Sequence, residues 1–381
     1  MVGRLTPHQG KDLEGIFIVS IEQAVAAPYA SGKLADAGAR VVKVERPEGD
    51  FARGYDADAH GFSSYFVWLN RGKESCCLDL KDPSDLALAE KMIGKADVFI
   101  QNIMPGALDR LGLIMEKLRQ RYPQLITCSI SGYGSDGDYS QMKAYDLLIQ
   151  AETGLSSITG GPNEAGRVGV SICDILAGMT AFQAILQALY GRNKTGKGRH
   201  IEVSLFSALA DWMNVPYVQH HYGGKVIGRP GLHHPTIAPY GIYPCKDGGM
   251  VLLSIQNERE WAKLAEQVLE RPDMITSAEF STNISRVKNR DALNVIMHEE
   301  FGKYDLNKMA DRLHQAGIAY GRLNGIEDLI HHPQTQYITT MTSAGEVAMI
   351  APGALFDGAP MVASNVPDLG QHSDQLRKEF S

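Results

Sequence analysis

Asp174 is a lone carboxylate at the start of a strongly apolar stretch that runs from Ile175 to Tyr190. Apolar or small residues fall on nearly every side of that stretch, which predicts a buried helix. Asp174 is then expected at the helix N-cap, the commonest role of an aspartate in this place. A second role is compatible with the first, because free backbone N–H groups and the helix dipole favour an ionised carboxylate. Held at the edge of a buried helix, such a carboxylate can act as a nucleophile.

Arg46, Lys73 and Arg110 each follow a predicted strand or stand just beyond one. In a parallel sheet these positions share one edge, where open α/β sheets bind their ligands. Any one of the three could be an ordinary solvated surface cation. Three together, in an acidic protein, predict a site for an anionic small molecule.

Motifs for other chemistries are incomplete. The segment GRNKTGK (191–197) has the skeleton of a P-loop, but Gly198 replaces the Ser or Thr and a helix is predicted before it. AVAAP stands after the first predicted strand, where a dinucleotide-binding G-x-G-x-x-G would be expected. Adjacent histidines point in different directions and chelate a metal poorly. We therefore expect no metal and no prosthetic group at the histidine pairs 220–221, 233–234 and 331–332.

Composition narrows the class of protein further. The 381 residues carry a formal net charge of −7, which argues against nucleic acid or an anionic membrane as partner. No apolar run reaches bilayer-spanning length, and the segment 1–11 lacks the features of a signal peptide. Five cysteines without CxxC spacing fit reduced thiols. The expected compartment is the cytoplasm or an organelle matrix.

Predicted strands and helices alternate through the first third of the chain. Strands are expected at 16–21, 40–45, 76–80, 97–101 and 125–130, and helices at 28–37 and 82–94. Strands separated by helices imply crossover connections and a largely parallel sheet covered on both faces. A second α/β stretch has a strand at 250–255 and helices at 258–269, 290–301 and 306–316.

The domain boundaries follow from these patterns. A large domain (1–205) carries the sheet and Asp174, and a Gly-, Pro- and His-rich stretch within 206–248 forms a linker and active-site loop. Residues 249–335 form a smaller α/β domain. Residues 336–381 are expected to pack back on the large domain.

An ordered set of motifs spans nearly the whole chain: AAPYASGKLADAGARVVKVERPEGDFARG, LNRGKESCCLDL, DVFIQNIMPGALDRLG, ISGYGSDG, KAYDLLIQAETGL, VSICDILAGM and KTGKGRHIEVSLFSAL. In this combination the chain resembles the class III CoA-transferase family, the relatives of formyl-CoA transferase and α-methylacyl-CoA racemase. The resemblance implies a Rossmann-like large domain, a smaller domain and a homodimer of interlocked subunits.

The same resemblance implies roles for single residues. Asp174 aligns with the aspartate that forms acyl-anhydride and aspartyl-CoA intermediates. The positions implied to line the CoA channel are Val25, Ala26, Arg46, Lys73, Asn102, Arg110 and Tyr133. A CoA thioester is the implied substrate, and no prosthetic group is implied.

Two positions depart from parts of the family. Racemases pair a histidine with the aspartate, because moving a proton between two faces of a carbon needs two acid/base groups, and Tyr145 stands at that position. This disfavours racemase activity. The glycine-rich loop of formyl-CoA transferase is replaced by Gly228 to Pro235, which argues against the formyl/oxalate pair.

The implied reaction moves CoA from succinyl-CoA to a small C5 dicarboxylate such as itaconate, mesaconate or citramalate. The distal carboxylate of such an acid needs a cation or a hydrogen-bond donor. The candidates are Arg229, His233 and His234, with Arg53, Lys143 and Tyr145 also possible, although the loop residues fit a purely structural turn equally well. An acyl-CoA racemase and a non-catalytic CoA-binding protein remain the alternatives.

Overall fold

A computed structural model describes residues 12–358 and 364–381. The segment 1–11, discussed above for signal-peptide features, lies outside the described residues. The chain divides into two compact units. Described residues of the large unit are 12–156, 167–226, 336–358 and 364–381, and those of the small unit are 157–166 and 227–335. The four-part division given above stays a prediction.

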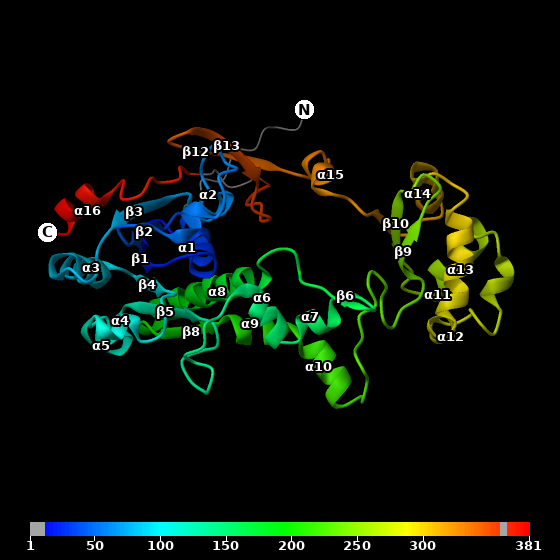
Figure 1. Ribbon diagram of the computed structural model, residues 1–381, viewed down its shortest axis with the longest axis horizontal. Coiled ribbons are helices and arrows are strands. Elements are labelled where there is room, and N and C mark those ends of the chain that lie inside the picture. Colours follow the sequence, from blue (N-terminus) through cyan, green and yellow to red (C-terminus); the bar gives the residue numbers. More distant parts are fainter. Residues whose placement is uncertain (1–11, 359–363) are drawn as a thin grey trace. The chain divides into compact units, whose positions relative to one another are not determined.

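The large unit is built on a six-stranded sheet (Figure 1), and the parallel arrangement of its strands is as the sequence predicts. Its strands are β1 (Phe17–Ile21), β2 (Arg40–Glu45), β3 (Lys73–Cys77), β4 (Val98–Gln101), β5 (Ile126–Ser131) and β8 (His200–Ser204). Their order, β3-β2-β1-β4-β5-β8, is that of a doubly wound sheet. The chain reverses its winding direction between β1 and β4, which opens a ligand crevice at the carboxyl ends of these two strands.

Strand β3 begins earlier than predicted. It runs from Lys73 to Cys77 rather than over 76–80, because Lys73 pairs with Val41 in the register with β2. Lys73 is therefore the first residue of its strand. The expectation that it stands beyond the strand, at the carboxyl edge, is wrong.

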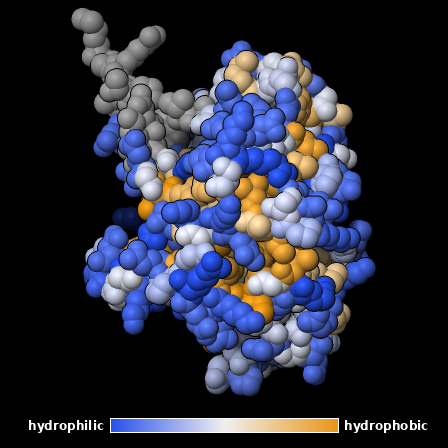
Figure 2. All heavy atoms as spheres, turned by 90° about the vertical axis from the view of Figure 1, so that its left-hand side faces the viewer, coloured by the Kyte–Doolittle hydropathy of each residue, from blue (hydrophilic) through white to orange (hydrophobic). Residues whose placement is uncertain are grey.

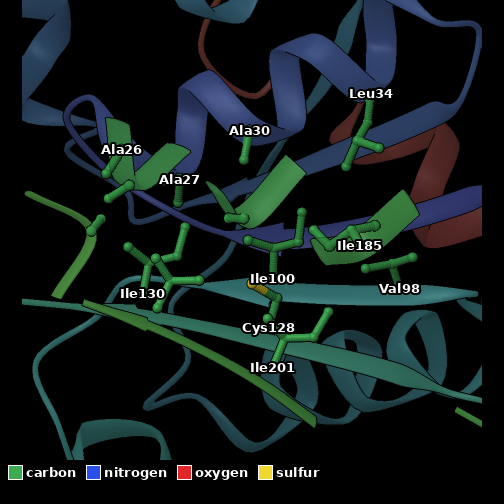
Figure 3. Close-up of a cluster of buried hydrophobic side chains, with 14 of the residues drawn as sticks. Ala26, Ala27, Ala30, Leu34, Val98, Ile100, Cys128, Ile130, Ile185 and Ile201 are labelled. Carbon is green, nitrogen blue, oxygen red and sulfur yellow. The ribbon is translucent and has the colours of Figure 1, made fainter. Parts of the chain in front are cut away.

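Helices cover both faces of this sheet. One apolar core lies under α1 (Ala26–Asp36), α8 (Ile172–Thr195) and α9 (Leu205–Trp212), and Figure 3 shows its side chains from α1, α8 and strands β4, β5 and β8. The other core lies under α3 (Pro83–Lys95), α4 (Ala107–Arg110), α5 (Met115–Arg121) and α16 (Ser373–Glu379). Asp82 caps α3 as predicted, accepting hydrogen bonds from the N–H groups of Ser84 and Asp85.

Helix α8 is longer than predicted at both ends. It starts after Ser171 and continues to Thr195, where Gly196 adopts the left-handed conformation that ends it. Asp174 is therefore the third residue of the helix rather than its N-cap. By length and composition α8 could cross a membrane, contrary to the expectation that no such run exists, but it packs against α1 and the sheet as a core helix.

The described part of the large unit contains seven further elements. They are η1 (Phe51–Gly54), α2 (Ser64–Asn70), α6 (Asp146–Glu152), α7 (Leu155–Ile158, part of which belongs to the small unit), α10 (Asn214–His221), β12 (Tyr337–Thr342) and β13 (Gly345–Ile350). Backbone hydrogen bonds join Gly72 to Asn365 and Ser75 to His372, so the C-terminal segment contacts β3 and the turn before it.

The small unit has its own antiparallel sheet and apolar core. Its sheet order is β11 (Tyr320–Arg322), β10 (Met250–Ser254), β9 (Tyr240–Pro244), beside the short hairpin β6 (Gly160–Gly161) and β7 (Glu164–Ala165). Its helices are α11 (Glu258–Lys263), α12 (Asn283–Lys288), α13 (Arg290–Phe301), α14 (Leu306–Gln315) and α15 (Ile326–Ile330). The single helix predicted at 258–269 becomes π-helical from Leu264 to Val268, and the short 3-10 helix η3 spans Pro272–Ile275.

Candidate active site

A cavity of about 500 Å³ lies where β1, β4 and β5 end, and Asp174 lines it from the first turn of α8. Aromatic side chains form much of the wall, namely Phe51, Tyr55, Tyr65 and Tyr145. The Tyr65 hydroxyl lies 3.3 Å from Ser171 Oγ, at the residue that precedes α8. Asp174 thus lines an open cavity that is large enough for a small acyl group.

The Asp174 carboxyl is not stabilised in its ionised form. Burial, followed by the nearby charge of Asp146, raises its pKa from 3.8 to about 7. The sequence predicts that the helix dipole favours the ionised carboxylate, whereas burial and the charge of Asp146 both favour its protonated form. A carboxylate with this pKa is still about half ionised at neutral pH, and it is poorly solvated.

Asp146, at the start of α6, caps helix α8 in place of Asp174. Its Oδ1 accepts hydrogen bonds from the N–H groups of Cys173 (2.7 Å) and Asp174 (3.4 Å). Its Oδ2 accepts one from Gln150 Nε2 (2.7 Å). The sequence interpretation missed Asp146, since a cap supplied from 27 residues away leaves no local spacing pattern.

The segment Gln23–Ala26 forms the opposite wall and leads into α1. The side chain of Asn102 holds Gln23 through both main-chain groups: Oδ1 accepts from Gln23 N (2.9 Å) and Nδ2 donates to Gln23 O (2.8 Å). Ala24 has a φ of 61°, which is unfavourable for a residue with a Cβ. Asp50 Oδ1 stabilises that turn by accepting from Ala24 N (3.0 Å).

Val25 and Ala26 expose backbone donors to the same cavity. Within the described part of the chain, the N–H of Val25 has no hydrogen-bond partner, and Ala26 is the first residue of α1, whose N–H no helix can satisfy. Helix α8 comes close to this turn because Gly178 lacks a side chain. A Cβ there would lie 2.6 Å from the carbonyl oxygen of Ala26.

Beneath the turn lies a buried network of charges. Lys43 Nζ bonds Asp50 Oδ2 (2.8 Å), and Lys73 Nζ bonds Glu22 Oε1 (2.7 Å), with all four side chains buried. Burial alone would raise the pKa of Glu22, but Lys73 and Lys43 lower it to about 2. The sequence does carry a signal for this network, because the strand RVVKVE places charged residues among apolar ones that are expected to be buried.

Two residues predicted to bind the substrates, Lys73 and Arg53, are paired with acidic residues inside the protein. Lys73 Nζ also donates to Pro28 O (3.0 Å) and Asn70 Oδ1 (3.0 Å), so it lines neither this cavity nor the next one described. The Arg53 guanidinium makes two bonds to the Glu45 carboxylate (2.8 and 2.7 Å) and lies over the Phe66 ring.

A second cavity of about 380 Å³ brings Arg46 and Arg110 together, and Lys81, which the sequence interpretation missed, joins them. One part of its lining is apolar and includes Ile103, Leu78, Leu80, Leu108 and Leu111. Four acidic residues also line it, of which Glu22, Glu45 and Asp50 are paired with Lys73, Arg53 and Lys43, and Asp79 is the fourth. Gln23 lines both cavities. Cations beside an apolar wall suit a ligand that combines phosphates with a flat ring system.

Other predicted residues lie elsewhere. Tyr133 packs edge-on against Tyr139 and also contacts Phe206, and Lys143 is exposed; neither lines the two cavities. In the small unit, Arg229 donates to the carbonyls of Ser157, Gly161 and Pro162.

His233 and His234 both have internal contacts in the small unit. His233 packs edge-on against Tyr243, burial lowers its pKa, and its Nδ1 has no hydrogen-bond partner among the described residues. His234 stacks on Tyr240. Over 12–358 and 364–381, no three His, Cys, Asp or Glu side chains are grouped so that they could hold a metal ion.

Residues 13–373 match the model of CoA-transferase family III. The chain therefore belongs to this family of enzymes, whose substrates are CoA thioesters, and the resemblance found in the sequence is confirmed.

Curated relatives cover nearly the whole chain. Acetyl-CoA:oxalate CoA-transferase of Acetobacter aceti is 34% identical over 99% of this chain and 98% of its own length. Succinyl-CoA:glutarate CoA-transferase of Homo sapiens is 32% identical over 97% of this chain and 86% of its own. Succinyl-CoA:mesaconate CoA-transferase of Haloarcula hispanica is 28% identical over 96% of both.

Among solved structures, a CAIB/BAIF family protein from Brucella suis superimposes with a TM-score of 0.84 at 32% identity. The match covers 97% of this chain and 99% of that one. The predicted α/β fold class is thereby confirmed.

Proposed function

We propose that this enzyme transfers CoA from succinyl-CoA to a small dicarboxylic acid, with Asp174 as the nucleophile. The observation that carries the proposal is the half-buried Asp174 carboxyl, which lines the same cavity as Val25 and Ala26 at the start of α1. Relatives named for succinyl-CoA with glutarate or mesaconate support the choice of donor and of acceptor class.

The reaction begins when an Asp174 carboxylate oxygen attacks the thioester carbonyl of the donor. The C–S bond breaks, CoA leaves as a thiolate, and a mixed anhydride remains on Asp174. The thiolate then attacks Cγ of Asp174, which releases the donor acid as a carboxylate and leaves an aspartyl-CoA thioester. The acceptor carboxylate reverses both steps and regenerates Asp174.

Each attack places negative charge on a former carbonyl oxygen. The N–H groups of Val25 and Ala26 are the donors we assign to that oxyanion, helped by the positive end of the α1 dipole. Gly231, in the loop 228–235, does not supply a further donor, because its N–H is already bonded to Gly160 O (3.1 Å). The cavity walls must also exclude water, because both intermediates hydrolyse readily.

CoA binding is assigned to the second cavity. Arg46, Arg110 and Lys81 would meet the phosphates, and the leucine-rich wall would take the adenine. Since Gln23 borders both cavities, the pantetheine arm would cross there to reach Asp174. Asn102 supports this route by fixing Gln23 rather than by binding CoA.

The acceptor panel follows from the relatives. Itaconate, mesaconate and citramalate stay candidates, glutarate joins them, and the 34% identity to an oxalate enzyme returns oxalate to the panel. The loop departure over 228–235 is therefore a weak guide to the acid.

A homodimer with interlocked subunits completes the proposal. Helix α10 has no buried residue in the chain, and large apolar side chains at the end of α9 and along α10 are exposed: Trp212 (59%), Val215 (67%) and Tyr217 (55%). Exposed apolar surface of this kind is typical of a subunit interface.

The test incubates the enzyme with succinyl-CoA and a panel of free acids and follows new thioesters by mass spectrometry. We expect dicarboxylyl-CoA products from the wild type and no turnover from Asp174→Ala, with a hydroxylamine-trapped adduct on Asp174. Near-normal turnover of Asp174→Ala would exclude the mechanism. An acyl-CoA racemase would instead exchange an α-proton in deuterated water without any acceptor, and a CoA-binding protein would do neither.

A further inference from the structure

Of the described charged residues that line the cavity containing Asp174, all but one are acidic. Among the described residues that line it, four carry charge: Asp56, Asp146, Arg167 and Asp174. Arg167 is the one cation of this lining. A ligand carrying a carboxylate beyond its reacting end needs such a cation, since burying an unpaired charge is costly.

The neighbouring acids are already satisfied by internal hydrogen bonds. Asp56 accepts from Ser64 N (2.7 Å), Ser64 Oγ (2.7 Å), Asp58 N (3.2 Å) and Ser63 Oγ (3.4 Å). Asp146 accepts from α8 and Gln150. By contrast, Arg167 is an exposed residue whose guanidinium makes one hydrogen bond among the described residues, from Nη2 to Gly169 O (3.1 Å), and no ion pair there. Most of its five N–H donors are free to bind a ligand.

The main chain beside Arg167 is fixed from inside the protein. The fully buried Gln150 accepts from Val168 N (2.9 Å) through Oε1 and donates to Val168 O (3.4 Å) through Nε2. The same Nε2 donates to Asp146, which caps α8. Gln150 therefore links the Arg167 segment to the helix that carries Asp174, so both charged groups are positioned by one buried hydrogen-bond chain.

The other cations considered for this role have different surroundings. Arg53 is paired with Glu45, and Lys143 does not line the cavity. Arg229 bonds three carbonyls of the small unit.

We propose that Arg167 binds the distal carboxylate of the dicarboxylic acid and so selects dicarboxylates over monocarboxylates. This inference rests on the proposed CoA-transferase function and adds a specificity-determining residue to it. A guanidinium can hold a carboxylate through two parallel N–H···O bonds, which a lysine ammonium cannot reproduce.

The test is an internal competition. Glutarate and valerate, which have the same chain length, are supplied at equal concentration with one acyl-CoA donor, and the ratio of glutaryl-CoA to valeryl-CoA is measured by mass spectrometry. This ratio reports relative kcat/KM for the two acids. It does not depend on donor binding or on the fraction of folded enzyme.

Arg167→Gln is expected to lower the ratio by about 10- to 100-fold, the loss for a hydrogen bond to a charged group. Arg167→Lys should lower it less. Lys143→Gln, which removes a nearby exposed cation, is the matched control and should leave it unchanged.

Two outcomes would overturn the proposal. An unchanged ratio in Arg167→Gln shows that this residue does not select the acid, and leaves the Asp174-dependent transfer intact. An equal fall in Lys143→Gln shows a general effect of charge. Failure of the wild type to make any dicarboxylyl-CoA would instead refute the proposed acceptor class itself.

Discussion

At the scale of single residues, Asp146 is the group that most directly adjusts Asp174, the nucleophile of the proposed mechanism. Asp146 caps the helix that carries the nucleophile, and its charge adds to the effect of burial on the Asp174 pKa. The free enzyme therefore holds a carboxyl whose pKa is close to neutrality, where a nucleophile can be both available and reactive.

The activity of the free enzyme should follow this ionisation. We expect kcat/KM to rise with pH through an inflection near pH 7, because Asp174 must lose its proton to attack. Asp146→Asn removes the neighbouring charge and should move the inflection to lower pH. A pH–rate profile of both enzymes checks this, and identical inflections would show that Asp146 does not act on Asp174 electrostatically.

The same shift affects folding stability. The pKa of Asp174 is raised in the folded state, so the native protein binds more protons than the unfolded chain between pH 3.8 and about 7, and stability falls over that window. Asp174→Asn avoids this loss. Urea titrations at several pH values should show it more stable than wild type by up to about 4 kcal/mol above pH 7, with little difference below pH 4. An equal difference at every pH would contradict this origin.

Asp174, Arg46 and Arg110 could be found from the sequence, because each follows a recognisable element or motif. Asp146, Asp50 and Arg167 could not, because their roles depend on hydrogen bonds to distant segments or on which side chains share a cavity. Lys73 was placed on the channel by its motif, whereas the fold uses its charge to neutralise Glu22.

At the scale of elements, the close approach of α8 to α1 shapes the active site. Gly178→Ala would set a Cβ 2.6 Å from Ala26 O and 2.9 Å from Tyr29 Cβ. We expect a destabilisation of about 1–3 kcal/mol and slower transfer, because α1 must move away from Asp174. Gly191→Ala is the matched control in the same helix, since its Cβ would meet nothing closer than 3.8 Å. Thermal unfolding and kcat are measured for both variants. Equal effects of the two substitutions would show that the close contact of α8 with α1 at Gly178 is not the cause.

The turn at Ala24 depends on Asp50. Asp50→Ala removes the bond to Ala24 N, and the left-handed conformation then costs about 1–2 kcal/mol without compensation. Transfer should slow by roughly tenfold, as a loss of this size predicts. Adding Ala24→Gly should recover part of the rate, because glycine adopts a positive φ freely. If the double variant is no faster, the loss comes instead from breaking the buried Lys43–Asp50 ion pair.

Most elements were predictable because their hydrophobic runs, caps and glycines are local features. The strand at 40–45 and the helix at 290–301 appear with the predicted bounds. The errors arose where pairing or packing decides: the register of β3 with β2, the π-helical turn after α11, and the start of α8.

At the scale of the molecule, many large apolar side chains are exposed. Figure 2 shows apolar side chains exposed among hydrophilic ones on the side of α3, α4, α5 and α16. Large apolar residues are also exposed on α9 and α10. The composition alone did not indicate this, since 44% hydrophobic residues is an ordinary share.

We expect a dimer in solution. Sedimentation velocity should give about twice the chain mass of 41.6 kDa. Tyr217→Asp, which places a charge on the exposed side of α10, should weaken the assembly, because an interface core does not tolerate an unpaired carboxylate. A monomer at every protein concentration tested would refute the proposed assembly.

The hold of Asn102 on Gln23 has one more consequence. The N–H of Gln23 is occupied and its carbonyl already accepts one hydrogen bond, so this residue offers the amides of a thioester arm no donor and one remaining acceptor lone pair. A pantetheine arm that crosses Gln23 can therefore shift along its own length at little energetic cost. The proposed chemistry needs this freedom, because the sulfur must travel from the acyl carbonyl to the aspartyl one and back while the nucleotide end stays anchored.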